Sequence, residues 1–206
     1  MERLNEIIQQ CVRNSAEILN ELYTKGKSDL TSLVIPNYRR EGYLRLSEQE
    51  LRFVFCSQLE KILQDEPKKG NRIHYCVEEP TKDIYKFSEK GSLLKDPKKG
   101  EGQSANFDLT IEDEACKALI EFKAKKATPF SYKKDLSTLW NPKDDIENKQ
   151  TSRFFINIFE KTSSDKVKFK NYIENKLGDF QKQEKKKIVE VIGIFLHDGK
   201  VDIISI

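Results

Sequence analysis

The sequence has few of the side chains that mark the commonest catalytic and metal sites. Its 206 residues include two histidines, one methionine and one tryptophan, and its four cysteines are scattered along the chain. Zinc fingers and related sites need closely spaced cysteine and histidine ligands, so we expect free, buried thiols instead. The nine glycines form no phosphate-binding loop and no Gly-x-Ser-x-Gly elbow, which argues against P-loop nucleotide hydrolases and α/β-hydrolases.

Long apolar runs are also missing. None approaches the roughly 20 residues that a membrane-spanning helix needs, and Met1 opens an amphipathic segment rather than a basic and then apolar signal segment. These absences predict a cytoplasmic protein that does not bind membranes. Of the residues present, 37% are apolar and 34% are charged, which at this length predicts one main domain with a substantial core and a highly charged surface.

Positive charge is carried mainly by lysine, in short clusters, although the net charge is only +3. Lysine neutralises phosphate as a point charge, whereas arginine more often recognises guanine through two hydrogen bonds. The clusters therefore favour contact with a nucleic-acid backbone over the reading of bases. A solvated surface explains any single cluster equally well. The lysines that we predict to contact nucleic acid are Lys98, Lys99, Lys125, Lys126, Lys133 and Lys134.

The chain begins with a predicted helix and a predicted linker. Residues 2–23 carry apolar side chains at the three- and four-residue spacing of an amphipathic helix. The segment after it contains Pro36 and Gly42 and should be irregular. We therefore divide the chain into an N-terminal helical arm with its linker, residues 1–43, and a main domain, residues 44–206. The apolar stripe of the arm must pack on its own domain or on another chain, which would create a homodimer.

Helical and strand patterns alternate in the main domain. Ser47, followed three residues later by Glu50, is a capping box, so a helix should begin there and run to about Leu63. The order of the later patterns predicts an α/β fold with a central mixed β-sheet flanked by helices. The predicted strands are 73–77, 84–87, 106–111, 118–124, 153–160, 189–196 and 201–206, the later predicted helices are 131–150, interrupted at Pro142, and 167–185, and a turn is predicted at 112–114.

Charged residues occupy two of these strands at positions where apolar residues would build a core. Residues two apart on a strand point to the same face, so Glu121 and Lys123 should project together from an apolar run. In the preceding strand Phe107 and Leu109 flank Asp108 and should bury the face opposite to it. If the two strands pair, three charged groups converge. Taken alone, Glu-x-Lys more often forms a salt bridge on a solvent-facing strand.

An aspartate on one strand, Glu-x-Lys on the next and a glutamate on a preceding buried helix resemble the PD-(D/E)XK nuclease superfamily. The resemblance implies the restriction-endonuclease-like fold and covers residues 44–206 in the order of their elements. Phe107, rather than proline, precedes the aspartate, which is a departure from the family name. The resemblance therefore depends on a few residues and on element order.

The resemblance also implies a role for each matching residue. Asp108 and Glu121 would ligate Mg²⁺ or Mn²⁺, with Glu50, or alternatively Glu60, as the carboxylate from the helix. Lys123 would orient or activate the attacking water. Magnesium prefers oxygen ligands and is usually held by one or two carboxylates together with substrate phosphate, so the chemistry of these residues agrees with that role.

The function implied is a metal-dependent endonuclease that hydrolyses phosphodiester bonds of DNA, in restriction, repair or defence. The alternative is a nuclease-like domain that binds nucleic acid or a protein partner without cutting. Binding of a divalent metal that depends on Asp108 would separate the two, because only the enzyme needs the ion.

Overall fold

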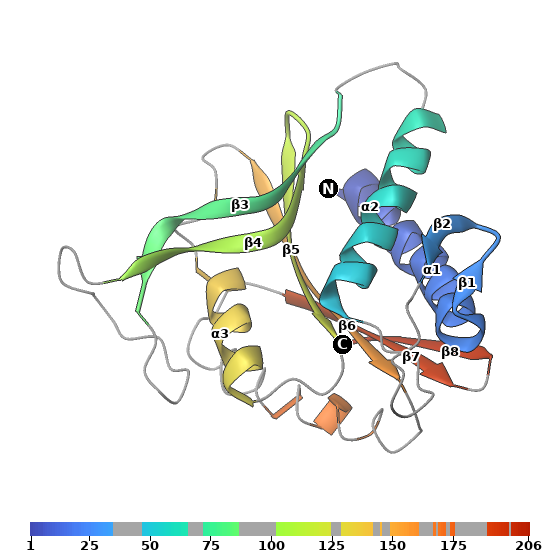
Figure 1. Cartoon of the computed structure of the whole chain (residues 1–206). Coiled ribbons are helices and arrows are strands. Elements are labelled where there is room, and N and C mark those ends of the chain that lie inside the picture. The colour runs from blue at the N-terminus through green and yellow to red at the C-terminus, as the bar shows by residue number, and fades with distance from the viewer. Residues whose placement is uncertain are drawn as a thin grey trace.

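The described part of the chain is built around one mixed sheet (Figure 1). The computed structural model describes residues 1–34, 47–65, 72–86, 102–124, 129–141, 145, 149–160, 167, 169–171, 174–175, 189–197 and 199–206. Its elements are α1 (Glu2–Lys25), β1 (Lys27–Ser28), β2 (Thr31–Val34), α2 (Glu48–Asp65), β3 (His74–Tyr85), β4 (Gln103–Glu112), β5 (Cys116–Ala124), α3 (Pro129–Leu139), β6 (Gln150–Glu160), β7 (Val189–His197) and β8 (Lys200–Ser205).

Six strands form this sheet in their order along the chain, from β3 at one edge to β8 at the other. The pairs β5–β6 and β6–β7 are parallel and the remaining pairs are antiparallel. Parallel neighbours need a crossover connection, and α3 lies in the connection from β5 to β6. The predicted α/β fold with a central mixed sheet is confirmed.

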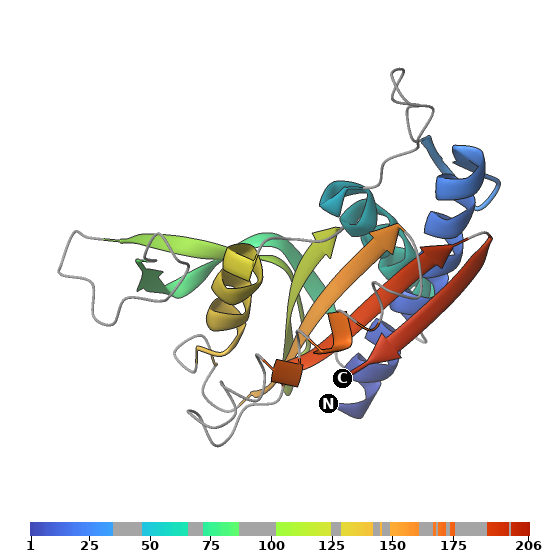
Figure 2. The same cartoon turned by 90° about the horizontal axis from the view of Figure 1, so that it is seen from below.

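Helices cover both faces of the sheet, as the alternation along β5 demonstrates. Ile120 and Phe122 belong to the apolar core that α1 and α2 form with the sheet, whereas Leu119 belongs to a second apolar cluster that includes residues of α3. Successive side chains on a strand point to opposite faces, so α3 lies on the other side of the sheet from α1 and α2 (Figure 2). β5 is buried on both faces, so its charged residues Lys117, Glu121 and Lys123 are buried together with its apolar ones.

The helix predicted as an N-terminal arm is part of the main core. The stripe of α1 that includes Ile8, Val12 and Leu19 is fully buried in the cluster that contains α2 and the sheet. The helix ends at Gly26, whose left-handed φ of 74° is typical of a glycine cap. The stripe thus packs on its own chain, the first of the two alternatives. A homodimer through this helix and a boundary near residue 43 stay predictions, since residues 35–46 lie outside the described part.

The predicted strands 73–77 and 84–87 form one long strand instead of two short ones. β3 pairs with β4 from His74 to Tyr85, with a shift of register between Pro80 and Ile84. Just before the shift Glu78 has a φ of 58°, a left-handed conformation that is uncommon for residues other than glycine. The apolar alternation is interrupted at this irregularity, and this interruption made one strand look like two.

Elsewhere, most of the predicted ends of helices and strands agree with the structure. The predicted turn at 112–114 is confirmed, because the Asp113 carboxylate accepts hydrogen bonds from the N–H groups of Ala115 and Cys116 at 2.8 and 2.7 Å. The predicted helix 131–150 is too long at its C-terminal end, since α3 ends before Pro142 and β6 already begins at Gln150. Most of the predicted helix 167–185 lies outside the described residues.

Cysteine burial agrees only in part with the prediction. All four cysteines are free, and Cys11 and Cys116 are buried, but Cys56 is only partly buried and Cys76 is exposed. The exposed thiol lies on β3, which is an edge strand and therefore has fewer neighbours to cover it. Among the described residues, no helix has the length and apolar character needed to cross a membrane.

Candidate functional site

β4 and β5 pair as far as Leu109 and Ile120, and beyond this point β4 remains paired only with β3. Figure 1 shows β3 and β4 extending together away from the rest of the sheet. Asp108 lies at the point of separation, where its Oδ2 accepts a hydrogen bond from the backbone N–H of Phe122 at 2.7 Å. A buried N–H without a partner is costly. The aspartate thus replaces a backbone carbonyl and is held beside β5.

The separation also changes which faces the neighbours of Asp108 occupy. Leu109 packs in the core with α1 and α2, but Phe107 packs in the cluster with α3. Residues two apart on a regular strand would share a face, so β4 is bent or twisted at Asp108. The prediction that Phe107 and Leu109 bury the same face is wrong for this reason. Asp108 itself is largely buried, with 21% of its side chain exposed.

A cleft of about 330 Å³ opens between this bend and α3. Asp108, Glu121 and Lys123 all line it, so the fold brings together three of the four residues predicted to be catalytic. They come from the two strands that separate here. The other lining residues are Glu78, Ser104, Ala105, Asn106, Lys134, Asp135 and Thr138.

Glu121 is the most buried carboxylate of the cleft, with 5% of the residue exposed. Burial, followed by repulsion from Asp108 and Asp135, raises the pKa of Glu121 well above its ordinary value, and the attraction of Lys123 offsets this only in part. Burial alone disfavours the charged form of this carboxyl group, and the neighbouring carboxylates add to that effect. A bound cation would offset both.

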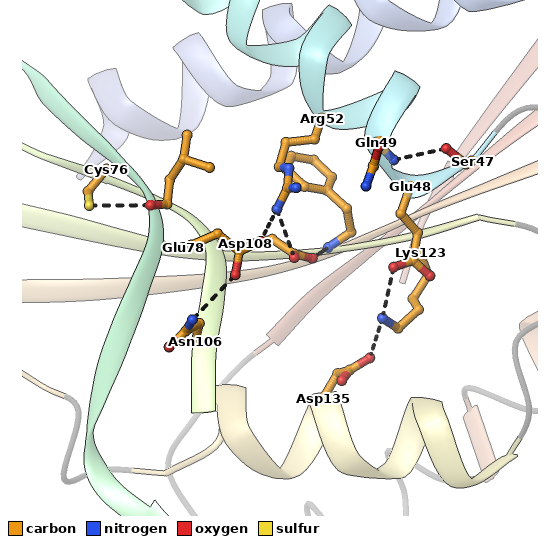
Figure 3. Close-up of polar contacts among 12 residues, drawn as sticks. Ser47, Glu48, Gln49, Arg52, Cys76, Glu78, Asn106, Asp108, Lys123 and Asp135 are labelled. Atoms are coloured by element: carbon orange, nitrogen blue, oxygen red, sulfur yellow. Dashed lines mark hydrogen bonds and ion pairs between the residues drawn. The ribbon is translucent and has the colours of Figure 1, made fainter. Parts of the chain in front are cut away.

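Lys123 is held between two acidic side chains from different helices (Figure 3). Its Nζ lies 2.9 Å from Oδ2 of Asp135 on α3 and 3.4 Å from Oε2 of Glu48 on α2. Burial disfavours the charged form, but Asp135, Glu48 and Glu121 outweigh it and raise the pKa of Lys123 above its ordinary value. Lys123 is therefore a permanent ammonium at neutral pH and acts through its charge.

Arg52 of α2 joins the two facing carboxylates of β3 and β4 (Figure 3). Its guanidinium contacts the carboxylate of Glu78 and lies 3.5 Å from Oδ1 of Asp108. The register of β3 on β4 puts Glu78 opposite Asp108, where like charges would repel each other without a cation between them. Arg52 thus neutralises part of the acidic charge. Because it lies beside Oδ1 of Asp108, Oδ2 remains available to accept the hydrogen bond from the N–H of Phe122 on β5.

The structure does not bring Glu50 into the cleft. Its carboxylate accepts hydrogen bonds from the backbone N–H of Ser47 at 2.7 Å and from the Ser47 hydroxyl, which confirms the capping box. The alternative, Glu60, accepts a hydrogen bond of 2.7 Å from the hydroxyl of Tyr75. Neither is among the described residues that line the cleft. The helix contributes Glu48 instead, which reaches the site through Lys123.

Asp135 was missed by the sequence reasoning, although a signal for it exists. It is 8% exposed and follows Tyr132 by three residues on α3, on the same stripe as the buried Leu136 and Leu139. A charged residue on the apolar stripe of a helix is unusual and needs a partner. Glu48 had no comparable signal, because an acidic residue in the first turn of a helix is ordinary.

The predicted nucleic-acid contacts are described only in part. Lys133 and Lys134 lie on α3, and Lys134 lines the cleft. Lys134 therefore lies next to the acidic residues of the cleft, and its contact with nucleic acid stays a prediction. The other predicted lysines, which lie outside the described residues, are Lys98, Lys99, Lys125 and Lys126.

A metal site in this cleft would depend on two carboxylates. Within the described part of the chain, no group of three or more histidine, cysteine, aspartate or glutamate side chains is arranged to hold a metal ion. Magnesium is usually bound by one or two carboxylates, with substrate phosphates and waters as the remaining ligands. Asp108 and Glu121 fit that mode, since both line the cleft and their mutual repulsion favours a cation between them.

Comparisons with known proteins add no relative. A search with protein-family models finds no match for the chain, and a search of curated proteins finds none either. A function for this chain must therefore be argued from the arrangement of side chains in the cleft and the order of the elements around it.

Proposed function

We propose that this protein is a metal-dependent endonuclease that hydrolyses phosphodiester bonds of DNA, in restriction, repair or defence. The observation that carries the proposal is the convergence of Asp108, Glu121 and Lys123 in one cleft. A salt bridge on a solvent-facing strand, the ordinary explanation of Glu-x-Lys, would leave both side chains exposed. Glu121 and Lys123 are instead 5% and 9% exposed, and buried charges of this kind are retained mainly where they are paired or needed for chemistry.

The elements around the cleft support a restriction-endonuclease-like fold. α2 precedes the antiparallel strands β3, β4 and β5, and α3 then connects β5 to the parallel strand β6. Asp108 lies on the second of these strands and Glu121 and Lys123 lie on the third, as the resemblance to the PD-(D/E)XK superfamily requires. The helix carboxylate is the weak point of this assignment, since Glu50 caps α2.

The residues of the cleft have separable roles in such a reaction. Mg²⁺ held by Asp108 and Glu121 would lower the pKa of a bound water and stabilise negative charge on the phosphate. Lys123 is charged and cannot accept a proton, so it would orient the attacking water and neutralise developing charge. Asp135 keeps that ammonium in place and charged. Arg52 and the N–H of Phe122 hold the Asp108 carboxylate in one orientation.

A second candidate function is a nuclease-like domain that binds DNA without cutting it. The position of Glu50 favours this alternative, because the cleft then has one ligand fewer than the resemblance implies. Titration calorimetry with Mn²⁺ separates the two functions. The enzyme should bind Mn²⁺ and lose that binding in the Asp108→Asn variant, whereas the non-cutting domain should bind no metal in either form.

The decisive experiment compares DNA cleavage by the wild type and by Asp108→Asn, Glu121→Gln and Lys123→Met with Mg²⁺ and with a chelator. We expect each substitution, and the chelator, to lower the rate by about a hundredfold to a thousandfold. Lys117→Met is the matched control, because Lys117 is a buried lysine on the same face of β5 that does not line the cleft. Equal cleavage by all three variants would contradict the proposal.

A further inference from the structure

We infer that the cleft takes DNA as a single strand rather than as an intact duplex. The inference rests on the proposed function and names the substrate class of that same site. It follows from the depth of the reacting groups, from a second hollow that continues the cleft, and from the distribution of charge along the two.

The groups that would act on the phosphate lie deep in the cleft. Glu121, Lys123 and Asp135 are each less than a tenth exposed, and Asp108 is the most accessible of the four. A substrate phosphate must therefore enter the cleft to reach them. The phosphates of a duplex lie on the outside of a stiff rod with a persistence length of about 50 nm, so none turns inward without bending or unpairing the DNA. The backbone of a single strand can turn inward freely.

A second hollow, of about 510 Å³, continues from the first along β3 and β4. The two hollows share Ser104 and Ala105 on one side and Lys134 of α3 on the other, so together they form one groove. Their sizes lie within the roughly 300–1,000 Å³ of pockets that enclose small ligands. A groove of this size accommodates a few nucleotides of one strand. The residues that only the second hollow adds are Tyr85, Lys86, Gly102 and Gln103.

Charge changes sign along the groove. The first hollow contains the carboxylates of Glu78, Asp108, Glu121 and Asp135, and the second contains no carboxylate among its described lining residues. Lys86 lines the second hollow and Lys134 lines both. A phosphate at the acidic end needs a divalent cation, whereas lysines can contact the neighbouring phosphates of the same strand directly. The pattern fits a strand whose scissile phosphate lies among the carboxylates and whose next phosphates lie beside the lysines.

Among the described residues that line the groove, none presents an exposed aromatic ring to bases. Proteins that bind single strands often stack bases on exposed aromatic rings, but Tyr85 is 4% exposed and its hydroxyl accepts a hydrogen bond from Asn141 at 2.8 Å. The polar side chains of Gln103 and Ser104 line the groove instead. Contacts to the backbone should therefore dominate, and we expect little preference for base sequence.

The test uses one DNA sequence in two forms, as a labelled single strand and annealed to its complement. Fluorescence anisotropy measures binding of each form, and gel assays with Mg²⁺ measure cleavage. We expect the single strand to bind at least about tenfold more tightly and to be cut at least about tenfold faster, because the duplex must first be deformed. Equal or tighter binding of the duplex would overturn the inference. Failure to cut either form would refute the proposed function, and the binding ratio would still decide the inference.

Substitution of the groove lysines tests the path of the strand. Lys86→Gln and Lys134→Gln should each weaken single-strand binding by about threefold to tenfold. Each should also make the slope of the logarithm of the binding constant against the logarithm of salt concentration less steep by about one. Lys200→Gln is the control, because Lys200 is an exposed lysine on β8, the opposite edge strand of the sheet. A wild-type affinity and salt dependence in both groove variants would contradict this path.

Discussion

The two faces of β5 are both buried but differ in polarity and charge, although the same nine consecutive residues build them. The face toward α1 and α2 is apolar and fully buried through Ala118, Ile120 and Phe122. The ring of Phe122 meets that of Phe55 edge-on, with 5.2 Å between the ring centroids. The face toward α3 carries three buried charges among its four side chains, those of Lys117, Glu121 and Lys123. One face stabilises the fold, which allows the other to contain charges that cost stability.

The charged face itself divides into balanced and unbalanced positions. Lys117 is paired with Glu79, whose pKa lies below its ordinary value because the hydrogen bonds from Lys117 and Thr110 outweigh the effect of burial. Glu121 has the opposite shift, because burial and its acidic neighbours outweigh Lys123. An ion pair whose two charges neutralise each other is typical of residues with a structural role. An unbalanced buried carboxylate in a cleft is typical of a site that binds something else.

The largest expected effect lies on the apolar face. Phe122→Ala should lower the free energy of unfolding by about 3–5 kcal/mol, because it leaves a cavity between β5 and α2. Urea denaturation followed by circular dichroism measures this loss. A loss below about 1 kcal/mol would mean that this face contributes little to stability, contrary to the comparison.

Asp135→Asn should act on activity instead. Asp135 raises the pKa of Lys123, so its loss lowers that pKa, and Lys123 loses its proton at lower pH than in the wild type. We expect cleavage to fall about tenfold to a hundredfold and the alkaline limb of the pH–rate profile to move to lower pH. Asp135→Glu keeps the charge and should restore the profile in part. An unchanged profile in the asparagine variant would assign Asp135 a purely structural role.

Glu121→Gln should raise the stability of the metal-free protein at pH values above the ordinary pKa of a glutamate. Because the pKa of Glu121 is raised in the folded state, the native protein keeps a proton that the unfolded chain has already released. Stability then falls as pH rises from the ordinary glutamate value through the raised one. The glutamine variant removes this contribution, although Asp135, whose pKa is also raised mainly by burial, leaves a slope of the same sign.

Thermal melts of the wild type and of Glu121→Gln measure this slope as the change in Tm with pH. The melts are recorded in chelator from about pH 4 to about pH 9, in steps of about 1 pH unit. Added Mg²⁺ provides the matching control, since it should raise the Tm of the wild type and not that of Glu121→Gln. Identical slopes in the two proteins would contradict the assignment of an unbalanced charge to Glu121.

The smallest effect is expected for Lys117→Met on the same face. The substitution leaves Glu79 without its ammonium, but this carboxylate is 31% exposed and still accepts a hydrogen bond from the Thr110 hydroxyl. We expect a loss of about 1 kcal/mol or less and wild-type cleavage. A loss of cleavage comparable to that of Lys123→Met would show that any buried charge on this face affects the site, and the division between structural and functional charges would fail.

Local patterns predicted most elements, since they depend on neighbours along the chain. The spacing in 2–23 predicted α1, and the capping box at Ser47 marked the start of α2. Glu121 and Lys123 point into one cleft because alternation on a strand is a local property. The same rule failed for Phe107 and β3, because pairing with neighbouring strands bends both segments out of the regular pleat.

The sequence by itself determined the class of fold, the capping box of α2 and the shared face of Glu121 and Lys123, because each of these depends on spacing along the chain. Only the tertiary structure decided which other carboxylates meet them. Asp135 approaches Lys123 because α3 crosses the face of β5, and Glu50 stays at its cap while Glu48 pairs with Lys123. Such encounters depend on burial and long-range packing, which no local spacing encodes.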